Sequence, residues 1–79
     1  MALYVLLVKT EEQKEYVTYE YGPNEKQLGL IRINKLTGDV KDLVPAAVDN
    51  HARVFMAAAV KLRQYVSSGE FPERTSWSS

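Results

Sequence analysis

The first clear pattern along the chain is a continuous apolar run near its start, Leu3–Lys9, which contains Tyr4, Val5 and Val8. A run this short has no polar face for a surface helix, and its β-branched and aromatic residues favour a strand. Apolar residues on both faces indicate a strand that is covered on both sides, so we predict a central position in a sheet. Thr10–Gln13 is expected to form the turn that follows.

Two further segments, Lys14–Tyr21 and Leu28–Asn34, change between more apolar and more polar residues at every second position. In the later segment Ile31 and Ile33 share one face. Alternation with a period of two is typical of a half-buried strand. The intervening Gly22–Asn24 is a strong breaker of regular structure. We therefore predict a second and a third strand.

The third strand is expected to enter a tight hairpin. Asn34 can accept a hydrogen bond from the backbone two residues ahead, and Gly38 can adopt the left-handed conformation that such a turn needs. Asp39–Leu43 is then a short fourth strand. Its charged residues Lys41 and Asp42 suit an edge strand that is protected against aggregation.

The pattern Gly-x-Ile-x-Ile-Asn-x-x-Thr-Gly-x-Val over Gly29–Val40 resembles the hairpin of the small secreted inhibitory domains of the PepSY type. The resemblance is confined to this hairpin. In that family a helix precedes the hairpin, whereas the helix predicted here follows it. The resemblance therefore supports the hairpin and implies no activity for this chain.

Residues 45–68 carry apolar residues at four-three spacing, which predicts one amphipathic helix. Pro45 suits the first helical position, although Val44 before it cannot cap the free N–H groups. Gly69 suits the left-handed stop after the last turn. The predicted buried stripe consists of Val48, Ala52, Phe55, Ala59, Leu62 and Val66.

Together these elements predict an α+β fold, with a four-stranded antiparallel β-meander followed by one C-terminal α-helix packed across one sheet face. Residues 1–69 are expected to form a single ββββα domain, and residues 70–79 a C-terminal tail. A helix over residues 45–68 would span about 36 Å, so it should overhang strands of about 23 Å. One helix is also narrower than four strands. Either the tail, with Phe71 and Trp77, or a second copy is expected to cover the rest.

The composition narrows the function classes. Among the 79 residues, ten Lys and Arg balance ten Asp and Glu, and this balance disfavours nucleic-acid binding. The chain has no cysteine, which excludes disulfides and fits a reducing cytoplasm. No apolar run is long enough for a membrane helix. A domain this small is marginally stable alone, and self-association is a common remedy.

No catalytic motif, cofactor fingerprint or metal-ligand spacing is present, so we expect neither an enzyme nor a bound cofactor or metal. His51 is the only histidine. It falls in the apolar sector of the predicted helix without a catalytic partner nearby in the sequence. A histidine satisfied by one hydrogen bond is favoured over a general base. Carboxylates in the first third, such as Glu11 and Glu12, are interpreted as solvated residues.

Two surfaces remain as candidates for binding. The sheet face away from the helix is predicted to present Tyr16, Leu28, Leu30 and Arg32, and apolar patches of this kind often mark protein contacts. The competing interpretations are that the tail covers this face, or that the strand register is shifted by one residue. We expect a small non-enzymatic interaction or regulatory protein, with a homodimer or another protein as partner.

The alternative is an RNA- or DNA-binding module that uses the basic side of the helix. Arg53, Lys61 and Arg63 lie along the outer and flanking surface of the predicted helix. Such residues could contact phosphates. A solvated helix face is favoured because few charges are involved.

Overall fold

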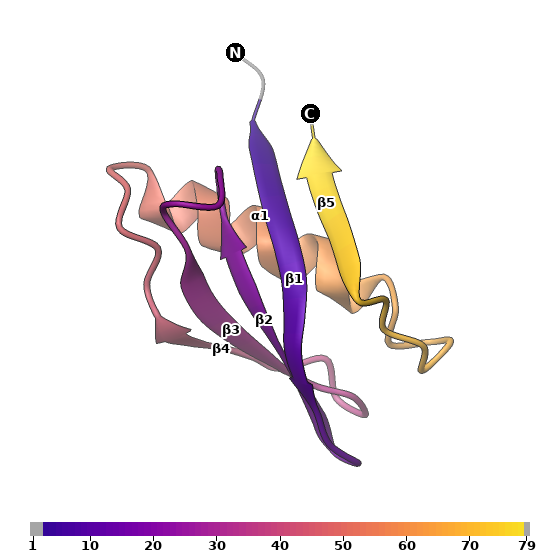
Figure 1. Cartoon of the computed structure of the whole chain (residues 1–79). Helices are drawn as coiled ribbons and strands as arrows, with labels where there is room; N and C mark the ends of the chain where they lie inside the picture. The colour runs from indigo at the N-terminus through magenta and orange to yellow at the C-terminus, as the bar shows by residue number, and fades with distance from the viewer. Residues whose placement is uncertain (1–2, 79) are drawn as a thin grey trace.

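The computed structural model describes residues 3–78, which form one antiparallel sheet with a single helix on one side (Figure 1). The α+β class and the helix packed on one sheet face are as predicted from the sequence. The strand order is β4-β3-β2-β1-β5. The strands are β1 (Tyr4–Glu12), β2 (Tyr16–Gly22), β3 (Gly29–Asn34), β4 (Val40–Val44) and β5 (Arg74–Ser78), and the helix is α1 (His51–Arg63).

The prediction of four strands is wrong by one, because residues 74–78 of the predicted tail pair antiparallel with β1. A four-stranded meander would leave the first strand at an edge, whereas its apolar run on both faces predicts a central position. The fifth strand supplies the missing neighbour, so β1 lies between β2 and β5. Phe71 and Trp77 therefore pack into the core beneath the helix and do not cover the other face of the sheet.

Both hairpins have identifiable local causes. In the β1–β2 hairpin the register shifts between Lys9 and Glu11, so β1 extends to Glu12 through the segment predicted as a turn. In the β3–β4 hairpin the Asn34 side chain accepts hydrogen bonds from the backbone N–H groups of Leu36 and Thr37. Gly38 has a φ of 78°, which confirms the predicted left-handed position.

The helix is shorter than predicted, since α1 begins at His51 and not at Pro45. Ala46 is buried, and its backbone N–H lies 3.4 Å from the Tyr21 hydroxyl. A Cβ on Gly29 would lie 2.1 Å from the Val44 carbonyl oxygen. This close approach holds the chain after β4 against β3, so the helix cannot start at Pro45.

The α-helix ends at Arg63, and bonds to the third preceding residue then continue as turns through Val66. The turns stop at Gly69, which has a φ of 74° and donates its backbone N–H to the Tyr65 carbonyl. A helix of 13 residues spans about 20 Å, close to the length of the strands. The predicted overhang of the helix is therefore wrong.

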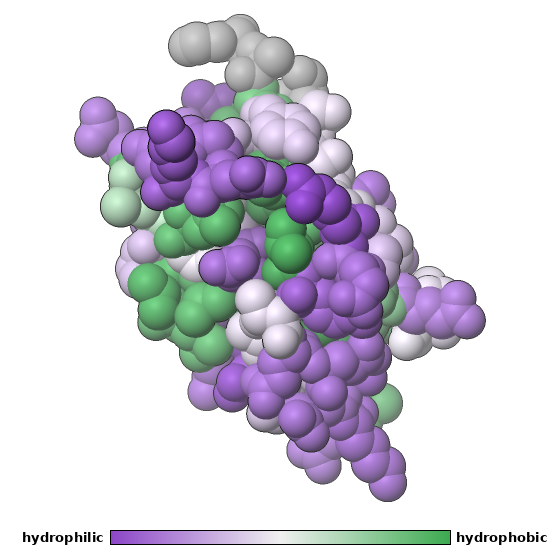
Figure 2. All heavy atoms as spheres, in the orientation of Figure 1, coloured by the Kyte–Doolittle hydropathy of each residue, from purple (hydrophilic) through white to green (hydrophobic). Residues whose placement is uncertain are grey.

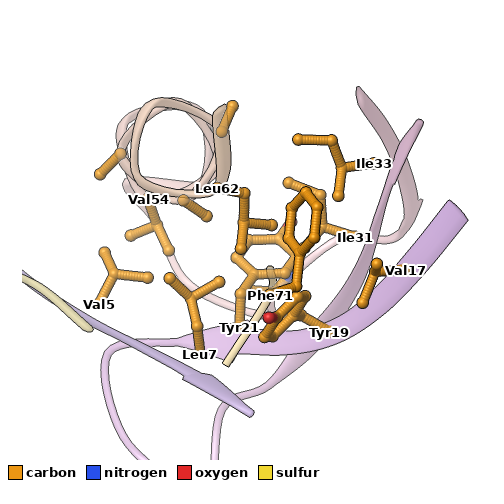
Figure 3. Packing of buried hydrophobic residues seen from close by; sticks show 14 residues of the cluster. Val5, Leu7, Val17, Tyr19, Tyr21, Ile31, Ile33, Val54, Leu62 and Phe71 are labelled. Atoms are coloured by element: carbon orange, nitrogen blue, oxygen red, sulfur yellow. The ribbon is translucent and has the colours of Figure 1, made fainter. Parts of the chain in front are cut away.

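The buried side of α1 is also rotated from the predicted stripe. Ala52 is exposed, whereas Val54 and Ala58, which the stripe omits, are fully buried. Leu62 is buried as predicted, and Phe55 packs at the margin of the core. Figure 3 shows Val54 and Leu62 pointing from the helix toward the sheet side chains. The sheet contributes Val5, Leu7, Val17, Tyr19, Tyr21, Ile31 and Ile33, each with no exposed surface.

Candidate protein-binding face

The strand register gives the sheet two unlike faces. Ile31 and Ile33 point toward α1, so Leu30 and Arg32 lie on the opposite side, which we call the open face. Arg32 pairs across the strands with Thr18 and with Lys41. No helix among the described residues 3–78 covers this side, because α1 packs against the other. The register predicted from the alternation is therefore correct, and the alternative of a one-residue shift is wrong.

An arginine–tyrosine stack lies on the part of the open face toward the β1–β2 hairpin. The Arg32 guanidinium lies 4.0 Å from the centroid of the Tyr16 ring. Its Nε donates to the Thr18 hydroxyl at 3.1 Å, and an Nη lies 3.6 Å from a Glu11 carboxylate oxygen. The ring and the Thr18 hydroxyl favour one direction of the guanidinium, and the partly exposed contact with Glu11 adds little. The face thus presents an aromatic–arginine pair, a combination that is enriched at protein interfaces.

Apolar residues adjoin this stack. Leu30 is half-buried and pairs across the strands with Val44, which is 48% exposed. Tyr4, at the start of β1 and therefore at the other end of the face, is also 48% exposed. Leu28 is half-buried in the connection before β3, where it packs beside Gly22. The structure therefore brings Tyr16, Leu30 and Arg32 together and places Leu28 at the margin.

Figure 2 looks onto the open face and shows green hydrophobic residues gathered toward the β4 side. Purple polar residues fill the end that carries the β1–β2 hairpin. The face is therefore neither as apolar as the protein core nor uniformly polar. Apolar surface beside a polar border is the composition found at protein interfaces.

Two shallow depressions lie on the open face, toward its two ends. The first, of about 260 Å³, is lined by Glu15, Tyr16, Arg32, Asn34, Asp39 and Lys41. The second, of about 420 Å³, is lined by Tyr4, Leu6, Pro23, Asn24, Glu25, Lys26 and Arg74. Both depressions combine aromatic or apolar residues with charged residues of either sign. Such a lining suits the side chains of a protein better than the uniformly negative backbone of a nucleic acid.

His51 has a partner that the sequence did not reveal. Its Nε2 lies 2.5 Å from one carboxylate oxygen of Asp42, and the other carboxylate oxygen accepts the Tyr21 hydroxyl at 2.6 Å. Burial, together with the bond to Asp42, raises the pKa of Tyr21 well above its usual value. This cluster joins β2, β4 and the first turn of α1, which agrees with a histidine satisfied by a hydrogen bond. Asp42 lies on β4 and His51 on α1, so the packing of the helix against the sheet brings them together.

A second group of charges lies where β1 extends beyond the helix. The Glu12 carboxylate accepts from the Lys35 and Lys9 ammonium groups, each at 2.6 Å. These two bonds, the one with Lys35 first, lower the pKa of Glu12 to about 2. The same contact with Glu12 raises the pKa of Lys9. Glu12, which we predicted to be solvated, is thus paired with two lysines.

The basic residues of the alternative reading do not converge. Arg63 donates its Nε to the Gly38 carbonyl at 3.0 Å and so ties α1 to the β3–β4 hairpin. The Lys61 ammonium lies 5.7 Å from the Tyr65 ring centroid, on the side of α1 that faces β5. Side chains two residues apart on a helix differ in direction by about 200° around its axis, so Lys61 and Arg63 point to opposite flanks. Arg53 is exposed, and its direction around the helix axis lies between those of Lys61 and Arg63.

Two further properties bear on the kind of site. Among the described residues, no group of three or more His, Cys, Asp or Glu side chains is arranged to hold a metal ion. No helix within residues 3–78 has the length and apolar character needed to cross a bilayer. Comparisons with protein-family models, with curated proteins and with solved structures found no match. The function must therefore be argued from the open face itself.

Proposed function

We propose that this chain is a small non-enzymatic interaction or regulatory protein that binds another protein through the open face of its sheet. The observation that carries the proposal is the uncovered sheet side with the Arg32–Tyr16 stack and the adjoining Leu30. Apolar surface beside charged residues supports a protein contact. Arg32 and Tyr16 would act as anchors, and Leu30 with Val44 would supply apolar contact area.

The test uses two leucine substitutions of the same chemistry. Leu30→Glu places a charge in the open face, whereas Leu36→Glu places it on the β3–β4 hairpin, where Leu36 is already 83% exposed. Wild-type and variant proteins serve as bait, and each candidate partner is then purified and titrated. We expect Leu30→Glu to weaken binding at least about 100-fold and Leu36→Glu to change it less than about threefold.

A photo-crosslinking residue gives the location directly. Placed at Lys41, which lies beside Arg32 on the open face, it should form a covalent product with the purified partner, and placed at Leu36 it should not. His51→Gln should leave binding intact, because the Asp42 contact lies on the helix side of the sheet. If Leu30→Glu binds as tightly as wild type while His51→Gln does not, the open face is not the binding site.

A further inference from the structure

The sheet ends in two edge strands that differ in how they are protected. Beside β4 the register breaks between Leu30 and Ile31. The strand also carries Lys41 and is followed directly by Pro45. Bulges, lysine and proline are the common means by which an edge strand resists pairing with another chain. β4 is therefore a protected edge.

β5 has none of these features. It pairs with β1 in unbroken register from Tyr4 opposite Ser78 to Val8 opposite Arg74. It contains no proline, and its one charged residue, Arg74, is its first. A regular edge without bulge, lysine or proline is a template for an additional strand.

The hydrogen-bond pattern tells which backbone groups of β5 point outward. The Lys9 N–H donates to the Glu73 carbonyl at 2.8 Å. Hydrogen-bonded and non-hydrogen-bonded pairs alternate along an antiparallel ladder, so Thr75 and Trp77 exchange bonds with β1. The residues whose N–H and C=O groups point away from β1 are then Arg74, Ser76 and Ser78.

An apolar shelf lies beside this edge on the helix side of the sheet. Met56 is 65% exposed and Val60, one helical turn later, is 43% exposed. A groove of about 330 Å³ runs between these residues and β5. Its lining is Leu3, Arg53, Met56, Ala57, Val60 and Trp77. An exposed shelf of this composition next to a free edge marks an interface.

We propose that β5 pairs antiparallel with β5 of a second copy of this chain, about a two-fold axis through Ser76. Ser76 is the central residue of the five in β5, and its backbone points outward, so the edge is complementary to itself. Arg74 would face Ser78 of the partner subunit, and no two like charges would meet across the ladder. The three outward residues would provide about six backbone hydrogen bonds between the copies.

Strand pairing alone buries too little surface for a stable dimer, since standard interfaces bury about 800 Å² per partner. The shelf supplies the remainder. A two-fold axis perpendicular to the sheet keeps both helices on one side, so the Met56 and Val60 shelves of the two copies lie along the same seam. The open faces then form one continuous surface. The inference rests on the proposed interaction function, which it extends by naming the second copy as a partner.

The first test is molecular mass by sedimentation equilibrium. We expect the wild-type protein to be a dimer at about 100 µM. Ser76→Pro removes an outward N–H without a bond to β1, so it should raise the dimer dissociation constant at least about tenfold with an unchanged circular dichroism spectrum. Ser76→Ala keeps that N–H and should remain dimeric. A wild-type monomer at this concentration would overturn the proposal.

The second test does not depend on whether the proline variant folds. Since the chain has no cysteine, any introduced thiol is unique. Ser76→Cys should form a disulfide-linked dimer on mild oxidation, because directly opposed residues are about 5.5 Å apart. Arg74→Cys should crosslink with Ser78→Cys in a mixture and not with itself. Ser67→Cys, at the exposed end of the helical segment, serves as the control.

The two proposals can fail separately. Leu30→Glu should lose the protein partner and still sediment as a dimer, whereas Ser76→Pro should be monomeric and still bind one partner per chain. If Leu43→Cys on β4 crosslinks efficiently and Ser76→Cys does not, the copies associate elsewhere, and the β5 pairing is wrong. If the dimer forms as described but Leu30→Glu binds normally, only the proposed function is wrong.

Discussion

The two faces of the sheet are built from the same strands and yet have opposite characters. On the helix side, Tyr19 and Tyr21 are fully buried and each donates its hydroxyl, to the Pro72 carbonyl and the Asp42 carboxylate respectively. On the open face, Tyr16 is half-exposed and stacks on Arg32. The same residue type thus ties distant parts of the chain together on one face and stacks at the surface on the other.

This difference follows from what covers each face. Beneath α1 every polar atom must find a partner inside the protein, and the buried tyrosine hydroxyls do so through distant segments of the chain. On the open face polar groups such as the Arg32 guanidinium bond to neighbouring side chains and are still partly exposed, so under the proposed function they can also contact a binding partner. Mutations on the helix side should therefore affect stability, and those on the open face should affect binding.

The largest effect is expected from Leu62→Ala, because Leu62 is fully buried between α1 and the sheet. We expect the free energy of unfolding to fall by about 2–5 kcal/mol. Gln64→Ala, on the exposed side two residues later, should change it by less than about 0.5 kcal/mol. Urea unfolding of both variants measures the difference. Equal midpoints would contradict the assignment of the buried side.

A smaller effect is expected from Tyr21→Phe. Removing the hydroxyl leaves one carboxylate oxygen of Asp42 without its donor, so the free energy of unfolding should fall by about 1–3 kcal/mol. Tyr16→Phe is the matched substitution on the open face, and it should cost less than about 0.5 kcal/mol. If both substitutions cost the same in thermal unfolding, the two tyrosines do not differ as described.

Arg32→Ala tests the open face itself. The guanidinium loses its stack on Tyr16 and its bond to Thr18, which at a partly exposed site should cost about 0.5–1 kcal/mol of stability. Its effect on partner binding should be larger, by about 2 kcal/mol or more. Comparing urea midpoints with titrations of the partner separates the two quantities. A loss of stability without a loss of binding would argue against an anchoring role.

The smallest expected effect is the pH dependence of stability that comes from Glu12. Glu12 is the last residue of β1. The folded-state pKa of about 2 lies below the ordinary value near 4.5, so the stabilisation is present above pH 4.5. It is lost as the pH falls from about 4.5 to about 2. Because the Glu12 carboxylate is about one-third exposed and solvent screens its contacts with Lys9 and Lys35, we expect about 0.5 kcal/mol. Wild type and Glu12→Gln should differ at pH 6 and converge near pH 2 in urea unfolding.

The strand β5 shows how a short signal can be missed. Thr75 and Trp77 alternate with Arg74, Ser76 and Ser78, which is the period of a half-buried strand. Five residues at the end of a chain carry little weight alone. A second signal was the apolar run on both faces of β1, since such a strand needs a neighbour on each side. The two observations together would have predicted β5.

His51 shows a different limit. The sequence places it near the apolar side of the helix, but its partner Asp42 lies on β4, and only the folding of the chain over the sheet brings them together. The start of α1 has the same cause. Pro45 suits a helix, yet the chain at Ala46 lies directly against Gly29, an approach that is possible only because Gly29 has no Cβ. The conformational preferences of neighbouring residues contain no information about either contact.

The sequence by itself determined which residues of the second and third strands share a face, the β3–β4 hairpin and the presence of one helix after it, because period-two alternation and turn residues such as Asn34 and Gly38 act over a few positions. Only the tertiary structure decided the fifth strand, the true start of α1 and the rotation of its buried side toward Val54. These features depend on contacts between residues far apart in the chain, where packing outweighs local propensity.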